Sequence, residues 1–235
     1  MILLGIDAST PKGSVALLSD GQVIAESIGS STLSDQILVL MDEVLRKLEK
    51  GLEEVDGFCV TTGPGSFTGL RVGVSLVKGL VLATEKPFWG INTLEAYANL
   101  VEPISQPISP ILDARKKEVY TAKFKYENKK IVRVTEDQAV SPQELCDLTQ
   151  EPTVFLGGGI EPYREILSSG LGNKFIDEAP VKNQTVAASA AQVVFNKFQD
   201  SPCIDLDALN IHYVRKSEAE INSNIINQEV VKHGH

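Results

Sequence analysis

The N-terminal half of the chain consists of short apolar runs between glycine and proline turns, followed by longer stretches with helical spacing. Short runs of aliphatic and β-branched residues between such turns are typical of strands, and apolar residues three or four apart are typical of helices. The predicted strands are residues 2–7, 14–19, 23–28, 57–62 and 87–91. The predicted helices are 34–49 with Ser34 as N-cap, a helix from the glycine-rich segment 61–69 to about 84, and a short helix capped by Asn92 or Thr93.

The same order of elements restarts after a proline-rich connector at residues 102–110. Predicted strands end at Asp113 and cover 118–126, 130–134 and 153–157. Predicted helices start at Ser141 and Pro142, a favourable N-cap and first-turn pair, and near 161, and a last one covers 185–199. We therefore expect two lobes, residues 1–103 and 104–217, followed by a frayed tail at 218–235.

Two short correspondences indicate that the lobes are duplicates of one another. Asp-Ala ends the first strand of each half, at Asp7 and at Asp113. A glycine-rich turn follows the fourth strand in each half, at 61–69 and at 157–159. Either match alone could arise by chance, but both occur at the same place in the same order of strands.

Composition and charge narrow the possible functions. The chain has 235 residues, of which 43% are hydrophobic and 23% charged, and this is an ordinary globular composition. The net charge is −9, with seven basic and 13 acidic residues in 1–103, and 15 and 18 in the rest. A protein that grips a phosphate backbone by itself normally has a basic face. If RNA is involved, we expect a partner to supply the positive surface.

Cysteine usage and the N-terminus predict a cytoplasmic protein. Cys59, Cys146 and Cys203 are far apart and odd in number, so neither a disulfide framework nor a paired metal motif is expected. The N-terminal ten residues reach an acidic side chain without a basic segment, unlike a signal peptide. The most apolar predicted helix contains Arg71 and Lys78, which argues against a membrane span.

The segment 61–75, TTGPGSFTGLRVGVS, first suggests a phosphate-binding loop. No lysine stands where a Walker A motif requires one, and Gly69 comes one residue too late for the dinucleotide fingerprint. Binding of an anion at the backbone N–H groups of residues 67–69 stays an alternative, because helix N-termini attract anions.

The helix after this turn is apolar around roughly 200° of its circumference, more than the ~100° needed to bury one face. Helix 34–49 is similarly broad, so one sheet face would not cover both. Either the two helices cover each other or they form a surface for another chain, with Gly69 and Gly73 allowing close approach. On the second interpretation, Gly73→Leu weakens a complex; on the first, it unfolds the chain. The predicted partner-binding residues are Ile37, Leu40, Met41, Val44, Gly69, Leu70, Gly73, Val74 and Val77.

These features together resemble a known family. The paired order of elements resembles the actin, Hsp70 and sugar-kinase ATPases. GPGSFTGLRVG at 63–73 is similar to the signature of the TsaB (YeaZ) family, and LDARKKEVY at 112–120, the triple glycine and HYVRKSEAE at 212–220 match its other landmarks. The resemblance implies an α/β, two-lobed actin-like fold with duplicated βββαβαβα lobes, each a mixed sheet flanked by helices.

The same resemblance implies a partner rather than an enzyme. TsaB-like proteins pair with a TsaD-like paralogue that modifies the adenosine next to the anticodon of ANN-decoding tRNAs, and a TsaE-like ATPase joins them. We expect a heterodimer with the paralogue through the first-lobe helices, a homodimer when the chain is alone, and only indirect contact with tRNA.

A degenerate nucleotide cleft is expected where the lobes face each other, without catalytic residues, resident cofactor or metal. Weak ATP or ADP binding at the interface with the partner stays open. An active phosphotransferase or ATPase that uses Asp7 and Asp113 is the alternative, although Asp7 could equally cap its own turn and Asp113 lie in a solvated hairpin. The residues assigned to the cleft are Asp7, Ser9, Asp113, Gly157 and Gly158.

Overall fold

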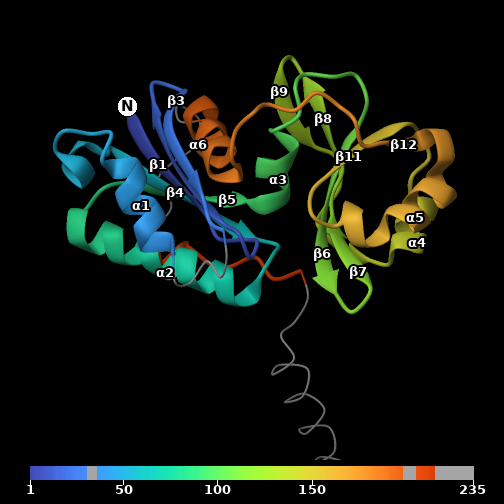
Figure 1. Cartoon of the computed structure of the whole chain (residues 1–235), viewed down its shortest axis with the longest axis horizontal. Coiled ribbons are helices and arrows are strands. Elements are labelled where there is room, and N and C mark those ends of the chain that lie inside the picture. The colour runs from blue at the N-terminus through green and yellow to red at the C-terminus, as the bar shows by residue number, and fades with distance from the viewer. Residues whose placement is uncertain (31–35, 198–204, 215–235) are drawn as a thin grey trace, which may run out of the picture.

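The computed structural model describes residues 1–30, 36–197 and 205–214, which form two lobes side by side (Figure 1). Each lobe is built on a mixed sheet, and the two sheets have equivalent strand orders, β3-β2-β1-β4-β5 and β10-β7-β6-β11-β12. In the first sheet β1, β2 and β3 are antiparallel neighbours, and in the second β6, β7 and β10 are, with the β8–β9 hairpin inserted between β7 and β10 in the chain. In both sheets the next two strands add in parallel. The predicted duplication and the two-lobed α/β fold are confirmed.

The first sheet is covered by helices on both faces because successive strand residues point to opposite sides. Leu4 and Ile6 pack with helices α1 and α2, whereas Leu3 packs with helix α6 on the other face. The elements of this lobe are β1 (Ile2–Asp7), β2 (Ser14–Ser19), β3 (Gln22–Ile28), α1 (Ile37–Leu45), the 3-10 turn η2 (Gly51–Glu54), β4 (Gly57–Gly63), α2 (Phe67–Thr84), β5 (Phe88–Asn92) and α3 (Thr93–Ala98).

The second sheet carries an additional hairpin and smaller helices. Helices α4 and α5 pack on one face around Ile111 and Phe155, and α3 and the β8–β9 hairpin pack on the other around Phe124. The elements of this lobe are β6 (Ile108–Arg115), β7 (Glu118–Thr121), β8 (Phe124–Glu127), β9 (Lys130–Arg133), β10 (Gln138–Val140), α4 (Pro142–Leu148), β11 (Thr153–Leu156), α5 (Ile160–Leu171), η3 (Gly172–Lys174) and β12 (Phe175–Ile176). The chain then continues into α6 (Val186–Lys197) and η4 (Leu206–Ala208), which pack on the first lobe.

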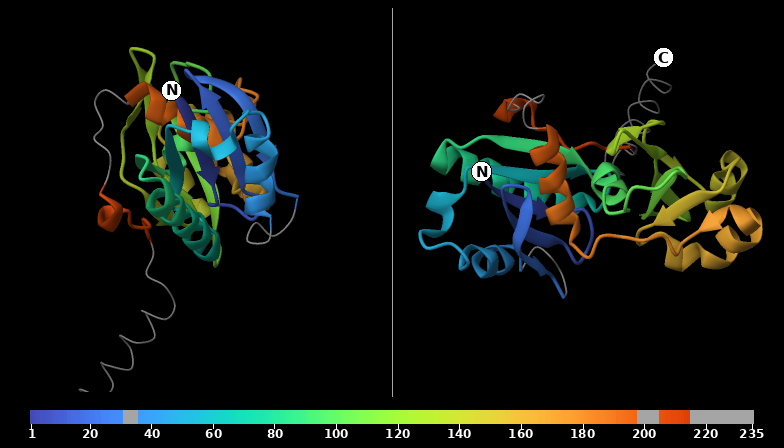
Figure 2. Two further views of the ribbon diagram at one scale, coloured as in Figure 1. Left: turned by 90° about the vertical axis from the view of Figure 1, so that its left-hand side faces the viewer. Right: turned by 90° about the horizontal axis from the view of Figure 1, so that it is seen from above.

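Two helices connect the lobes. Ala96 of α3 packs in the first-lobe core, whereas Leu94 and Ala98 of the same helix pack in the second, and Figure 2 shows α3 between the two bodies. Helix α6 follows the second sheet in the chain but lies on the first, where Gly5 allows its backbone to approach β1. A boundary at residue 104 therefore separates the two sheets, but it assigns α6 to the second lobe although this helix packs on the first. The predicted tail, 218–235, lies outside the described residues.

Most predicted elements are present with shifted ends. Helix α1 begins at Ile37 after Gln36, and the predicted cap Ser34 lies outside the described residues. Ser66, Asn92 and Ser141 cap α2, α3 and α4 by accepting hydrogen bonds from backbone N–H groups one turn on. The strand predicted over 118–126 is two strands, because β7 pairs with β10 whereas β8 turns to pair with β9.

Helix α2 is long and apolar enough, by length and composition alone, to cross a membrane, although only 28% of it is buried. It nevertheless packs against a sheet, since Val74 and Val77 lie in the core beside Val60 of β4. Apolar side chains of α2 therefore remain at the surface of this chain.

Candidate functional site

The glycine-rich turn between β4 and α2 lies directly against the end of β1. The backbone N–H of Ser66 donates to the carbonyl of Ser9 over 2.7 Å, and a side chain on Gly65 would collide with the same carbonyl. Ser66 Oγ accepts from the N–H of Gly69 over 3.3 Å, which occupies one of the donors that an anion at this helix N-terminus would use. The turn therefore packs against the chain's own β1–β2 connection.

Asp7 at the end of β1 is held by hydroxyl groups of its own lobe. Its Oδ1 atom accepts hydrogen bonds from Ser9 N (3.0 Å), Ser9 Oγ (2.6 Å) and Thr61 Oγ1 (2.8 Å). Asp7 is only 2% exposed, and burial raises the pKa of its carboxyl against the opposing effect of these hydrogen bonds. This is the geometry of an Asp capping its own turn, one of the two alternatives left open by the sequence.

Asp113, the equivalent residue of the second lobe, lies beside an exposed turn. Its Oδ1 accepts from the backbone N–H of Arg115 over 2.8 Å, and its Oδ2 lies 3.7 Å from the Arg115 guanidinium. Arg115 has a positive φ of 62° and a side chain that is 81% exposed. The carboxylate is therefore engaged locally, in the solvated hairpin that the three consecutive cations suggest.

The triple glycine fits tightly against β6 at two of its three positions. A Cβ on Gly157 would lie 2.5 Å from the carbonyl oxygen of Ile111, and one on Gly159 would lie 3.0 Å from it. Gly158 is exposed, and a Cβ there would have nothing within 4 Å. Of the three, only Gly158 is free of an internal packing requirement.

The five predicted cleft residues thus fall into two halves. Asp7 and Ser9 are bonded to each other, and Asp113 and Gly157 flank the same end of β6. Within the described part of the chain, no hydrogen bond joins Asp7 or Ser9 to the second-lobe half. None of the described residues forms a group of three or more His, Cys, Asp or Glu that could hold a metal ion.

The structure places most of the predicted partner-binding residues in the interior of this chain. Seven of the nine are buried in this chain and pack against its first sheet, so another chain could not touch their side chains. The flanks of both apolar arcs also pack on this core, because Met41 and Leu45 of α1 and Val72 and Leu76 of α2 are partly buried against it. The buried residues are Ile37, Leu40, Val44, Leu70, Gly73, Val74 and Val77, whereas Met41 and Gly69 are half-buried.

Other apolar side chains of the same two helices do reach the surface. Leu38 and Val39 of α1 are 59% and 56% exposed, and Leu82 of α2 is 73% exposed. Phe67, at the start of α2, is 37% exposed and stacks near Tyr213, with its ring beneath the Arg71 guanidinium at 3.7 Å. The helical period places Val39 and Leu82 outside the apolar bands of their helices, whereas Leu38 lies at the edge of its band.

A polar cluster between the lobes was not predicted. The Asp137 side chain is 3% exposed and accepts hydrogen bonds from Arg133 and, over 2.5 Å, from Asn92 Nδ2 at the end of β5. The ring atom Nε2 of His212 lies 3.1 Å from the same carboxylate, and the backbone N–H of His212 donates to the Thr62 carbonyl. No local motif signals this cluster, because its members come from positions far apart in the chain.

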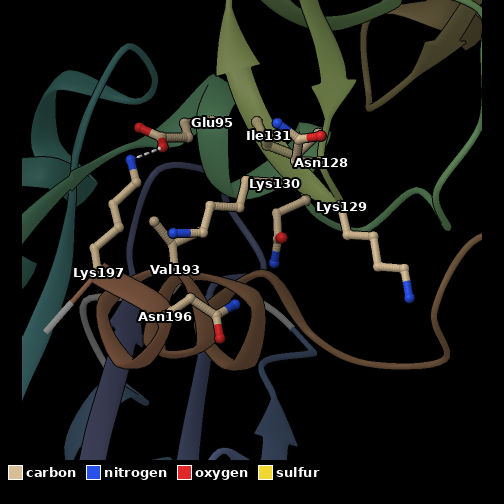
Figure 3. A pocket seen from close by; sticks show the side chains of 9 residues that line it. Glu95, Asn128, Lys129, Lys130, Ile131, Val193, Asn196 and Lys197 are labelled. Carbon is tan, nitrogen blue, oxygen red and sulfur yellow. Dashed lines mark hydrogen bonds and ion pairs between the residues drawn. The ribbon is translucent and has the colours of Figure 1, made fainter.

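A cavity of about 290 Å³ lies between α3, α6 and the β8–β9 hairpin. Figure 3 shows Lys197 of α6 paired with Glu95 of α3, Lys130 extending over Val193, and Lys129 pointing away. None of the predicted site residues lines it.

Comparison with known proteins gives consistent matches. The family model described as TsaD, tRNA N6-adenosine threonylcarbamoyltransferase, matches residues 24–208. The tRNA threonylcarbamoyladenosine biosynthesis protein TsaB of Bacillus subtilis is 30% identical over 226 residues, covering 94% of this chain and 96% of the relative. TsaB of Haemophilus influenzae is 30% identical over 183 residues, covering 73% and 78%.

Solved structures support the fold. A Pseudomonas aeruginosa protein described as similar to peptidase YEAZ superimposes with a TM-score of 0.75 at 21% identity, covering 91% of this chain and 99% of that one. A ROK hexokinase from Thermus thermophilus superimposes with a TM-score of 0.50 at 10% identity, covering 86% and 100%. These likenesses concern the two-lobed sugar-kinase-like architecture.

Proposed function

This chain belongs to the TsaB family of tRNA threonylcarbamoyladenosine biosynthesis proteins, and we propose that it acts there as a non-catalytic partner of a TsaD-like paralogue. The observation that carries the proposal is Gly79, an exposed glycine in the middle of α2. A Cβ on Gly79 would meet nothing within 4 Å, so no internal contact requires a glycine there. A glycine inside a helix costs about 1 kcal/mol relative to alanine.

The surroundings of Gly79 favour a docking face. Ser75 and Leu82 lie one turn away on either side and are exposed, and Leu76 and Leu80 beside them are only partly buried. Small residues one turn apart allow the backbone of another helix to approach closely. Helix α1 packs on the same face of the first sheet as α2. Its exposed residues Leu38 and Val39 add apolar area to this side of the molecule.

The state of Asp7 supports the non-catalytic part of the proposal. A carboxylate that positions a metal or a water must present oxygen atoms to the cleft, whereas Oδ1 of Asp7 already accepts three hydrogen bonds in a buried site. The alternative is an active phosphotransferase or ATPase that uses Asp7 and Asp113. Measurable ATP turnover with Mg²⁺ that disappears in Asp7→Ala would establish that alternative.

The remaining assignments extend the same proposal. When alone, the chain forms a homodimer through the surface of α1 and α2 that carries Gly79. When the paralogue is present, a heterodimer through the same surface replaces this homodimer. A TsaE-like ATPase joins the pair in the cytoplasm, any weak ATP or ADP binding occurs at the shared interface, and no membrane is involved. Most of the tRNA surface is contacted by the paralogue.

The test is to mix the purified chain with its TsaD-like paralogue and measure the mass of the product. We expect a mixed complex, which Gly79→Leu weakens while the variant stays folded. Ser169→Leu, at an exposed position of α5 in the other lobe, is the control and should bind normally. A homodimer that persists with no mixed complex would refute the proposal.

A further inference from the structure

The cavity between α3, α6 and the β8–β9 hairpin combines an apolar wall with a surplus of positive charge (Figure 3). Three lysines and one glutamate line it, whereas the chain as a whole carries a net charge of −9. Its volume of about 290 Å³ is close to the lower limit of about 300 Å³ for ligand pockets, and equals roughly ten water molecules of about 30 Å³ each. The cavity therefore has room for one small molecule.

The walls of the cavity are fixed by packing within the chain. Val193 of α6 is 4% exposed, and Ile131 of β9 packs on the core of the second lobe. Asn99, at the C-terminal end of α3, is 7% exposed, and its Nδ2 donates to Ser189 Oγ over 3.0 Å. A ligand would therefore meet a preformed site and would not have to order these side chains.

The lysines around the cavity differ in their partners. Lys197 of α6 pairs with Glu95 of α3, which holds its ammonium group beside the cavity. Lys130 extends over Val193, and among the residues that the structure describes no carboxylate lies within ion-pair distance of it. A lysine whose aliphatic stem lies along an apolar side chain keeps its charged end available. Lys130 therefore presents a positive charge to the cavity that this part of the chain does not neutralise.

We propose that this cavity binds a small organic anion, with its phosphate or carboxylate group at Lys130 and Lys197 and its apolar portion against Val193. An ammonium group has three hydrogen-bond donors, so Lys197 can bind the anion while it stays paired with Glu95. Helix α6 packs on the first sheet, and the β8–β9 hairpin packs on the second. A bound anion therefore also joins elements of both lobes.

The cavity is separate from the docking face around Gly79. Helix α2 packs on the face of the first sheet that carries Leu4 and Ile6, whereas α6 packs on the opposite face. The inference therefore does not rest on the proposed function, and the isolated chain is sufficient to test it. Its failure would leave the proposed partnership with the paralogue intact.

The test uses three probes that differ in charge. AMP carries a phosphate on a ring system, benzoate carries a carboxylate on a ring, and adenosine is the uncharged counterpart of AMP. Each is titrated into the isolated chain by calorimetry at low salt. The test variant is Lys130→Gln, and the matched control is Lys129→Gln, which removes the same charge from the adjacent residue, whose side chain points away from the cavity. Both lysines are exposed, so both variants should melt near the wild-type temperature.

We expect at least one of the two anions to bind the wild-type chain, and adenosine to bind more weakly than AMP. Binding of AMP alone would identify a phosphate site, and binding of benzoate alone a carboxylate site. Lys130→Gln should weaken binding by about 10-fold or more, because a hydrogen bond between charged groups is lost. Lys129→Gln should change it by less than about 3-fold, since an exposed charge outside the site contributes little.

Three results would each overturn the inference. The first is that neither anion binds, and the second is that adenosine binds as tightly as AMP. The third is that the two substitutions have equal effects, because binding that does not depend on Lys130 in particular takes place elsewhere on the chain.

Discussion

A Cβ atom placed on Gly73 of α2 would lie 2.8 Å from the Cβ of Ala8 at the end of β1. A side chain on Gly69, one turn earlier, would collide with the Ala8 carbonyl. The two glycines therefore bring α2 against its own sheet, and Gly73→Leu should destabilise the chain by about 3 kcal/mol or more through overpacking. Urea unfolding of the isolated chain measures this.

Gly79 provides the matched comparison on the same helix. Because its Cβ position is open, Gly79→Ala should raise the free energy of unfolding by about 0.5–1 kcal/mol. If Gly73→Leu remained as stable as wild type, the interpretation that this face is internal would fail.

Asp7→Ala and Asp7→Asn should differ in their effect on the free energy of unfolding. Alanine leaves Ser9 Oγ and Thr61 Oγ1 without their acceptor in a buried site, and we expect a loss of about 2–4 kcal/mol. Asparagine retains an amide oxygen that can accept hydrogen bonds from both hydroxyl groups, and it carries no charge. It should therefore fold with near-wild-type or greater stability at neutral pH.

The pH dependence of unfolding separates charge from hydrogen bonding at Asp7. Burial raises the pKa of this carboxyl above its ordinary value of 3.8, so the folded chain holds the proton more tightly than the unfolded chain. The contribution of Asp7 to stability is fully present below the ordinary pKa and falls as pH rises towards the raised pKa. The difference in unfolding free energy between Asp7→Asn and wild type should grow across that window and then level off. A difference independent of pH would show that Asp7 titrates normally.

The sequence predicted the topology well because its signals are local. Turn residues such as Asp20 and Gly21, and caps such as Ser141, are read directly from neighbouring positions. The side of α2 that faces the core could not be read in this way. Val77 is buried and Leu80 is only partly buried within one continuous apolar arc, and only the position of the sheet distinguishes them. Strand β10 has three residues, too few for a periodic signal.

The candidate site was predicted only in part, because only some of its signals are local in the sequence. Asp7 and Asp113 were found because each was predicted to end the first strand of its lobe, but their hydrogen bonds depend on Thr61 and on the turn at Arg115, where β6 ends. The cluster around Asp137 left no trace in the sequence, because Asn92 and His212 lie 45 and 75 residues away in the chain. Contacts at such separations follow from the assembled fold alone.

Substitution of Asp137, in the contact between the lobes, should strongly lower the free energy of unfolding. Its buried carboxylate accepts hydrogen bonds from Arg133 in its own lobe and from Asn92 in the other, with His212 beside it. Asp137→Ala removes the carboxylate partner of Arg133, whose side chain is 29% exposed and keeps only its hydrogen bond to the Thr135 carbonyl, and we expect a loss of about 2–4 kcal/mol. Asp177→Ala, which breaks the more exposed pair with Arg164, is the control and should cost under about 1 kcal/mol.

Asn92→Ala distinguishes an interlobe role of Asp137 from a purely local one. It removes the cross-lobe hydrogen bond and the side-chain cap of α3 but leaves the Arg133 pair intact. If the cluster holds the lobes together, combining Asn92→Ala with Asp137→Ala should cost clearly less than the sum of the two single losses in urea unfolding, because both changes remove the same interaction. Strictly additive losses would mean that Asp137 stabilises the second lobe alone. The relative position of the lobes would then depend on the apolar contacts of α3.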